Sequence, residues 1–181
     1  PALRTLPKPF IVSAGLEMRD YESLAAAVRG LPVTALICAG SPWAKVRYDT
    51  NGDQLPENVV VRSFSQPEMR EIYRLAEFAV LPILPTQRAC GMNVVLEAWA
   101  MGRAVIASRT EGLVSYIQDG ETGLFVPPSN VDELRQAILY LLSNPGEAER
   151  LGGNGYRKVH TELCMERYLD TVHATIDRAT Q

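Results

Sequence analysis

FAVLPILPTQRACGMNVVLEAWAMGRAVIA, residues 78–107, is the stretch of sequence that decides the fold. An apolar run from Phe78 to Leu84 has the length of a buried strand, and a loop carries the chain into an apolar helical segment from Met92 to Met101. Gly102 ends this helix, and a second apolar run follows from Ala104 to Ala107. A strand, a helix and a strand in this order predict two parallel strands joined by a crossover helix.

The same alternation runs from end to end of the chain. Further strands are predicted at Phe10–Ala14, Val33–Cys38, Asn58–Arg62 and Gly123–Val126, and further helices before Gly30, after Ser65, after Asn130 and around Met165–Ile176. Asn144-Pro145-Gly146 is predicted to break the helix that starts at Asn130. The pattern predicts a doubly wound, Rossmann-like parallel sheet of about six strands with helices on both faces. Such folds bind ligands outside the carboxyl ends of their strands.

The composition argues against several classes of protein. The 181 residues are 46% apolar and 22% charged, with a formal net charge of -3, which gives no basic surface for nucleic acid or anionic membrane. No apolar run approaches the ~20 residues of a transmembrane segment. The three cysteines, Cys38, Cys90 and Cys164, are odd in number and far apart, which argues against a disulfide framework or a zinc site and predicts a cytoplasmic protein.

The ends of the chain predict its organisation. Residues 1–9 contain several prolines and no initiator Met, so we expect them to be the remnant of an interdomain linker. Residues 10–160 are expected to form the α/β domain, and residues 161–181 a C-terminal helix.

The loop after the first strand, Ser13 to Tyr21, has two interpretations. Gly15 allows the backbone to approach a phosphate, a helix beginning near Arg19 would direct its positive end outward, and the Arg19 guanidinium could clamp phosphate oxygens. Alternatively, the loop is a tight turn followed by a surface Arg19 paired with Asp20 or Glu22.

The loop that enters the helix at Met92 carries a second candidate site. Gly91 leads directly into the helix, so the amides of Met92, Asn93 and Val94 are available to an anion. Glu97 is unusual inside a mostly apolar helix, because a buried carboxylate needs a partner. That partner is either a pair of ligand hydroxyls, such as a ribose diol, or a core arginine or backbone amides.

A family resemblance adds to these interpretations. From Gly91 to Ala107 the order of glycine, apolar stretch, Glu-Ala, glycine, basic residue and strand resembles the signature of the retaining GT-B glycosyltransferases of family 4, the glycosyl transferases group 1. The segments Thr110–Leu113 and Asp119–Pro128 resemble the loop and strand that follow in that family, and Ser13–Tyr21 resembles the first loop of one branch. The resemblance extends from Phe10 to about Tyr168.

The resemblance implies a nucleotide-sugar site. In that family this domain, here residues 10–160, binds a nucleoside-diphosphate sugar such as a UDP-sugar without an obligatory metal or other cofactor. Glu97 matches the glutamate that holds the ribose hydroxyls, and Arg19 matches a basic residue that neutralises the departing diphosphate. The implied donor-binding residues are Gly15, Arg19, Gly91, Met92, Asn93, Val94 and Glu97, with Phe64 and Ser65 near the nucleobase.

Three positions depart from the family pattern. Ala89 stands where the first glutamate of the family's pair contacts the donor sugar, and Leu16 stands where many members carry an arginine for the diphosphate. Gly91 also comes one place earlier than usual.

Taken together, these patterns predict the donor-binding half of a glycosyltransferase of the hexosyltransferase type. It would act with an N-terminal acceptor-binding domain that this sequence lacks, and be inactive alone. No catalytic side chain is assigned within it. The alternative is a non-catalytic nucleotide-sugar-binding module. A flavodoxin-like or receiver domain is disfavoured, because Lys45, Asp49 and Asp53 do not lie at strand ends. His160 and His173 are expected to be structural or solvent-facing.

Overall fold

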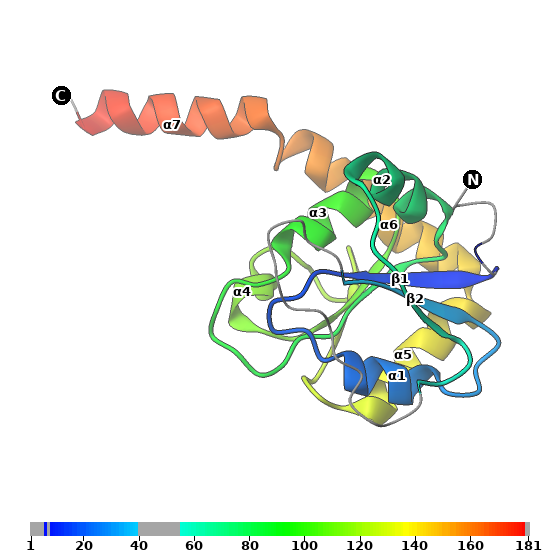
Figure 1. The fold of residues 1–181 in the computed structure, drawn as a ribbon. Coiled ribbons are helices and arrows are strands. Elements are labelled where there is room, and N and C mark those ends of the chain that lie inside the picture. Colours follow the sequence, from blue (N-terminus) through cyan, green and yellow to red (C-terminus); the bar gives the residue numbers. More distant parts are fainter. Residues whose placement is uncertain (1–5, 7, 40–54, 180–181) are drawn as a thin grey trace.

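A six-stranded parallel sheet forms the centre of the molecule, as the computed structural model describes it for residue 6, residues 8–39 and residues 55–179 (Figure 1). The strands are β1 (Phe10–Ala14), β2 (Thr34–Cys38), β3 (Val59–Val61), β4 (Ala79–Leu81), β5 (Val105–Ser108) and β6 (Leu124–Val126). The helices are α1 (Tyr21–Val28), α2 (Gln66–Leu75), α3 (Met92–Ala100), α4 (Glu111–Val114), α5 (Val131–Ser143), α6 (Pro145–Thr161) and α7 (Met165–Ala179). The predicted doubly wound fold is confirmed. The predicted linker lies largely outside the described residues, as do Lys45, Asp49 and Asp53.

Alternating side chains of each strand enter two different cores. In β1, Phe10, Val12 and Ala14 pack with α2 and α3, whereas Ile11 joins the core under α1 and α5. Figure 1 shows α1 and α5 on one face of the sheet and α2 and α3 on the other. Side chains of a strand point alternately to its two faces, so a sheet covered on both sides needs the continuous apolar strands seen here.

Two helices were not expected from the sequence, and several strands are shorter than predicted, β4 most of all. β4 ends at Leu81 rather than Leu84, because Pro82 has no N–H to donate to the ladder. Asn144-Pro145-Gly146 does end α5, but the same residues begin α6, since proline fits the first turn of a helix. The short α4 was missed as well.

The last helix, α7, leaves the body of the molecule and projects away from it (Figure 1). Its apolar side chains are exposed, with Met165 at 67% and Tyr168 at 64%. No helix within the described ranges is long and apolar enough to cross a membrane.

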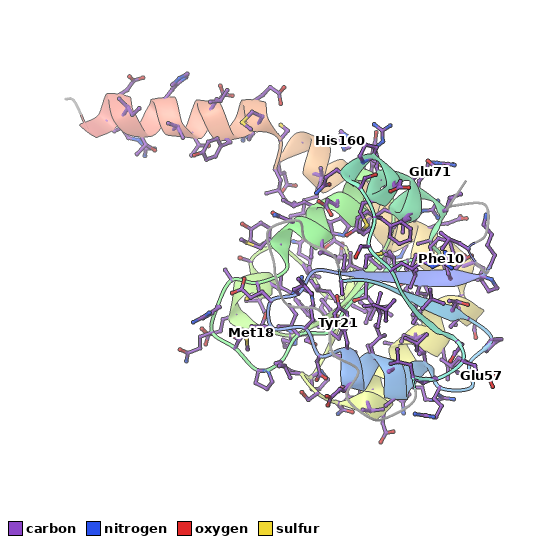
Figure 2. The ribbon with its side chains drawn as sticks, in the orientation of Figure 1. Phe10, Met18, Tyr21, Glu57, Glu71 and His160 are labelled. Atoms are coloured by element: carbon purple, nitrogen blue, oxygen red, sulfur yellow. The ribbon has the colours of Figure 1, made fainter. Side chains whose placement is uncertain are left out.

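The strand order is β3-β2-β1-β4-β5-β6. Successive strands are added on one side of β1 as far as β3, and on its other side from β4 onward. At such a switch point the loops that leave the two central strands diverge to opposite faces and open a crevice at the carboxyl edge of the sheet. In Figure 2, Met18, which follows β1, lies at this edge, and Phe10, the first residue of β1, and Glu57, which precedes β3, lie at the opposite one. The crevice is therefore the first place to look for a ligand site.

Candidate functional site

A cavity of about 680 Å³ opens in this crevice, between the loop after β1, the segment before α2 and the N-terminus of α3. All nine residues predicted from the sequence line it. The full lining is Ala14, Gly15, Leu16, Glu17, Arg19, Cys38, Phe64, Ser65, Gln66, Met69, Ala89, Cys90, Gly91, Met92, Asn93, Val94 and Glu97. Residues from four separate parts of the chain, one of them Cys38 at the end of β2, thus meet around one space. The volume of the cavity and its position at the carboxyl edge of the sheet are typical of a small-molecule binding site.

Gly15 and Arg19 form one wall of the cavity. Arg19 Nε donates to the carbonyl of Ala14 at 2.8 Å and Nη1 to that of Glu17 at 2.7 Å, so the guanidinium lies back over the loop. Gly15 has φ of +97°, and a Cβ there would come 2.5 Å from Arg19 Nη2. Only glycine fits this position, because it accepts both the left-handed backbone and the packed guanidinium.

The start of α1 differs from the expectation. The helix begins at Tyr21, and Asp20 is its cap, accepting from the backbone N–H of Ser23 at 3.1 Å and from the hydroxyl of Ser129 at 2.7 Å. Arg19 therefore precedes the helix and bonds carbonyls, so its pairing with Asp20 or Glu22 is wrong.

Backbone hydrogen bonds join the loop after β1 to the segment after β4. The N–H of Leu84 donates to the carbonyl of Met18 at 2.9 Å, and the N–H of Asp20 donates to that of Pro82 at 3.1 Å. The two loops that enclose the cavity are thus fixed to each other by main-chain contacts, which do not depend on side-chain conformation.

The N-terminus of α3 faces the cavity with N–H groups that have no acceptor within the helix. Gly91 is the N-cap with φ of +87°, and a Cβ there would come 2.7 Å from Leu81 Cδ2. Met92, Asn93 and Val94 occupy the first three helical positions, whose N–H groups have no carbonyl acceptor within a helix. These three amides and the positive end of the helix dipole favour an anion.

Glu97 lies one turn further along α3, half-buried, beside the phenol of Tyr73 on α2. Burial raises the pKa of Glu97, and the nearby Tyr73 hydroxyl partly offsets this by lowering it. Tyr73 is 1% exposed, and its hydroxyl makes no hydrogen bond of good geometry within the described residues, the approach to Glu97 included. Burial, together with the Glu97 charge, raises the pKa of the Tyr73 phenol above its ordinary value, so it stays a proton donor.

The charged groups around the cavity are few. Among the described residues that line it, Arg19 is positive and Glu17 and Glu97 are negative. Burial lowers the pKa of Arg19, with Tyr21 and Cys90 acting in the opposite direction. Burial also raises the pKa of Cys38 to about 12, which keeps this thiol protonated and uncharged at neutral pH.

Phe64 and Ser65 form the wall contributed by the segment before α2. Both the backbone N–H and the hydroxyl of Ser65 donate to the Glu68 carboxylate, at 2.8 and 2.7 Å. This is the capping interaction that Ser65 and Glu68 predict from their spacing, and it fixes the wall to the first turn of α2.

Sequence patterns did not single out Cys38, Gln66 or Met69, which also line the cavity. The position of Cys38 at the carboxyl end of a strand beside β1 is the signal that places it there. In the part of the chain that the structure describes, no cluster of three His, Cys, Asp or Glu side chains is arranged to hold a metal ion. His160 lies on α6, where its ring stacks on Tyr156 at 4.1 Å between centroids (Figure 2).

Known proteins share both the sequence pattern and the fold. The sequence profile of the glycosyl transferases group 1 matches residues 17–144. The chain is 27% identical to the lipopolysaccharide core biosynthesis glycosyltransferase LpsE of Rhizobium meliloti, over 90% of this chain and 48% of that protein. It is 34% identical to the D-inositol 3-phosphate glycosyltransferase of Kribbella flavida over 51% of this chain and 21% of that protein.

Solved structures agree. The sucrose-phosphate synthase of Thermosynechococcus elongatus superposes with a TM-score of 0.80 and 27% identity, covering 98% of this chain and 48% of that one. HepE from Anabaena, solved in complex with UDP-glucose, shares the fold with a TM-score of 0.79 at 16% identity, over 94% of this chain and 49% of that one.

The fold is one half of the GT-B architecture, and the chain belongs to the glycosyl transferases group 1 family. The family predicted from Gly91–Ala107 is therefore confirmed. The chain spans less than half the length of the curated relatives described above.

Proposed function

We propose that the cavity binds a nucleoside-diphosphate sugar and that the chain is the donor-binding domain of a retaining glycosyltransferase. One observation carries this proposal. The Arg19 guanidinium and the first amides of α3, which have no acceptor within the helix, meet in a single cavity at the switch point of the sheet. Positive groups of these two kinds are suited to a diphosphate. The HepE structure, which contains UDP-glucose, has the same fold and supports the choice of ligand.

Each side chain has a role in this proposal. The diphosphate lies on the amides of Met92 to Val94, and the ribose hydroxyls donate to the Glu97 carboxylate, with the base toward Phe64 and Ser65. Arg19 stabilises the charge that develops when the bond from the anomeric carbon to the diphosphate oxygen breaks. The acceptor hydroxyl oxygen forms the new bond to that carbon on the same face of the sugar and releases its proton.

The acceptor would be held by a further domain of similar size, because the relatives are about twice as long as this chain. We propose that the diphosphate is neutralised by protein groups without an obligatory metal. The three free cysteines fit a reducing compartment, and we propose the cytoplasm.

Calorimetry with UDP, GDP and ADP tests the donor site. At least one should bind, and Glu97→Ala should weaken it about tenfold, because the ribose hydroxyls lose a charged acceptor. Glu147→Ala, on α6 and outside the cavity lining, is the control and should bind as the natural chain does. Failure of all three nucleotides to bind would reject the proposal.

A non-catalytic binding module is a second candidate, favoured by the apolar Leu16 and Ala89 in the cavity wall. Both candidates predict nucleotide binding, and they differ in turnover. A longer natural chain that carries the acceptor domain should transfer or slowly hydrolyse the donor sugar if the first is correct. Nucleotide binding by that longer chain with no release of nucleoside diphosphate would favour the second.

A further inference from the structure

Two oppositely charged side chains meet at the rim of the cavity. Arg88 Nη1 lies 3.6 Å from Glu17 Oε1, and the two side chains are 76% and 68% exposed. Glu17 comes from the loop after β1 and lines the cavity, while Arg88 directly precedes Ala89, which also lines it. The pair therefore connects the two loops between which a ligand would enter.

The backbone of Arg88 is held by two hydrogen bonds, whereas its side chain is largely exposed. Its N–H donates to Thr86 Oγ1 at 3.0 Å, and its carbonyl accepts from the N–H of Cys90 at 3.0 Å. These bonds hold the backbone of Arg88 close to Gly91, the cap of α3, which follows three residues later. Within the described residues, its guanidinium interacts with the Glu17 carboxylate, in a long and exposed ion pair. Such a pair contributes little to stability, so it is easily exchanged for a stronger one.

The charges of the cavity show why Arg88 would leave Glu17 for a bound phosphate. One guanidinium and two carboxylates among its described lining residues leave a formal charge of -1 where a dianionic diphosphate is proposed to bind. Arg19 is already engaged with two carbonyl oxygens. Helix amides contribute only partial charge. A diphosphate at the start of α3 would thus lack a full second cation and would be repelled by Glu17.

We propose that Arg88 is a second diphosphate-binding cation, and that Glu17 holds it at the rim until a ligand arrives. On binding, the guanidinium leaves the Glu17 carboxylate for the phosphate oxygens, a bidentate partner of higher charge. No covalent bond changes. An uncharged ligand offers Arg88 no such partner, so the ion pair with Glu17 would persist when a nucleoside binds. This inference rests on the proposed donor site and adds a residue to it.

A double-mutant cycle tests the exchange. Kd is measured by calorimetry for UDP, GDP and ADP, and for the corresponding nucleosides, on the natural chain, Arg88→Gln, Glu17→Gln and the double variant. Arg88→Gln should weaken nucleoside diphosphates about tenfold and leave nucleosides unchanged, because a charge-assisted hydrogen bond to phosphate is lost. Glu17→Gln should tighten nucleoside diphosphates about threefold, since a competing carboxylate is removed.

The double variant separates contact from screening. If Arg88 touches the diphosphate, Arg88→Gln should still weaken binding in the Glu17→Gln background. If that loss disappears, Arg88 only screens Glu17 and the proposal is wrong. Arg88→Lys should retain part of the affinity, because it keeps the charge and loses the bidentate geometry. Arg150→Gln, which removes an exposed arginine paired with Glu147 on α6, is the matched control and should have no effect.

Equal Kd values for the natural chain and the Arg88 and Glu17 variants would overturn this inference and leave the donor site intact. A natural chain that binds none of the three nucleotides would overturn both.

Discussion

At the scale of single residues, the position of Tyr73 beside Glu97 affects the pKa of the carboxylate that lines the cavity. The phenol is buried and remains protonated, and Glu97 is the charged group beside it. A hydroxyl in this place can donate to one carboxylate oxygen and leave the other for a ligand hydroxyl. Tyr73 would then act through Glu97, as a positioning residue.

Tyr73→Phe should make nucleotide binding more sensitive to acid. Glu97 must be ionised to accept from ribose hydroxyls, so binding is lost as pH falls through its pKa. The Tyr73 hydroxyl lowers this pKa, so its removal raises the pKa and moves the loss to higher pH. Carboxyl 13C NMR should follow the pKa of Glu97 in the free protein, and calorimetry across pH should follow Kd. Tyr140→Phe, on the exposed side of α5, is the control; identical titration of Glu97 in Tyr73→Phe would refute the role.

At the scale of elements, the contact between α3 and α6 depends on one glycine. A Cβ on Gly155 would overlap the Trp99 ring, which is fully buried and whose Nε1 donates to the carbonyl of Thr122 at 2.9 Å. α6 therefore approaches α3 more closely than side chains would allow elsewhere, and Trp99 is fixed on both sides.

Gly155→Ala should destabilise the fold by about 1–3 kcal/mol, because the added methyl forces the Trp99 ring or α6 to move. Gly153→Ala, two residues away in the same helix, meets nothing within 4 Å and should stabilise by about 0.5–1 kcal/mol through helix propensity alone. Urea unfolding of both variants measures the difference. A Gly155→Ala variant as stable as Gly153→Ala would contradict the packing.

The sequence allowed the strands and most helices to be predicted, because apolar periodicity and glycine at helix ends are local signals. Helix α6 could not be predicted, because Gly152, Gly153 and Gly155 lower the helix propensity of this segment. Packing against Trp99, a contact that the sequence does not reveal, offsets this. Of the nine cavity residues, those after β1 and at the start of α3 could be placed because they follow strands of a parallel sheet, whereas Phe64 and Ser65 came from the family resemblance. The proximity of Tyr73 to Glu97 and the ion pair of Glu17 with Arg88 could not be predicted, because each joins side chains from separate loops or helices.

At the scale of the whole molecule, the strand order opens the cavity at the centre of the sheet rather than at an edge. A ligand there contacts the loop after β1, the start of α2 and the start of α3 together. Binding should therefore stabilise the entire domain and not one segment of it.

A nucleoside diphosphate at about one hundred times its Kd should stabilise the native chain by about 2.7 kcal/mol, which corresponds to a rise in Tm of roughly 5–10 °C. The rise should persist in EDTA, because amides and guanidinium groups are proposed to neutralise the diphosphate. Differential scanning calorimetry with and without chelator measures it, and the nucleoside at equal concentration serves as the control. Loss of the rise in EDTA would show that a metal ion takes part.

The main-chain bonds from Leu84 to Met18 and from Asp20 to Pro82 have a kinetic consequence. Backbone links between the two enclosing loops leave little conformational search for a ligand to wait for, so most of the cavity is preorganised before encounter. Association should then follow a single exponential phase whose rate rises linearly with nucleotide concentration. The one rearrangement required, rotation of an exposed arginine at the rim, occurs within nanoseconds and would not limit it.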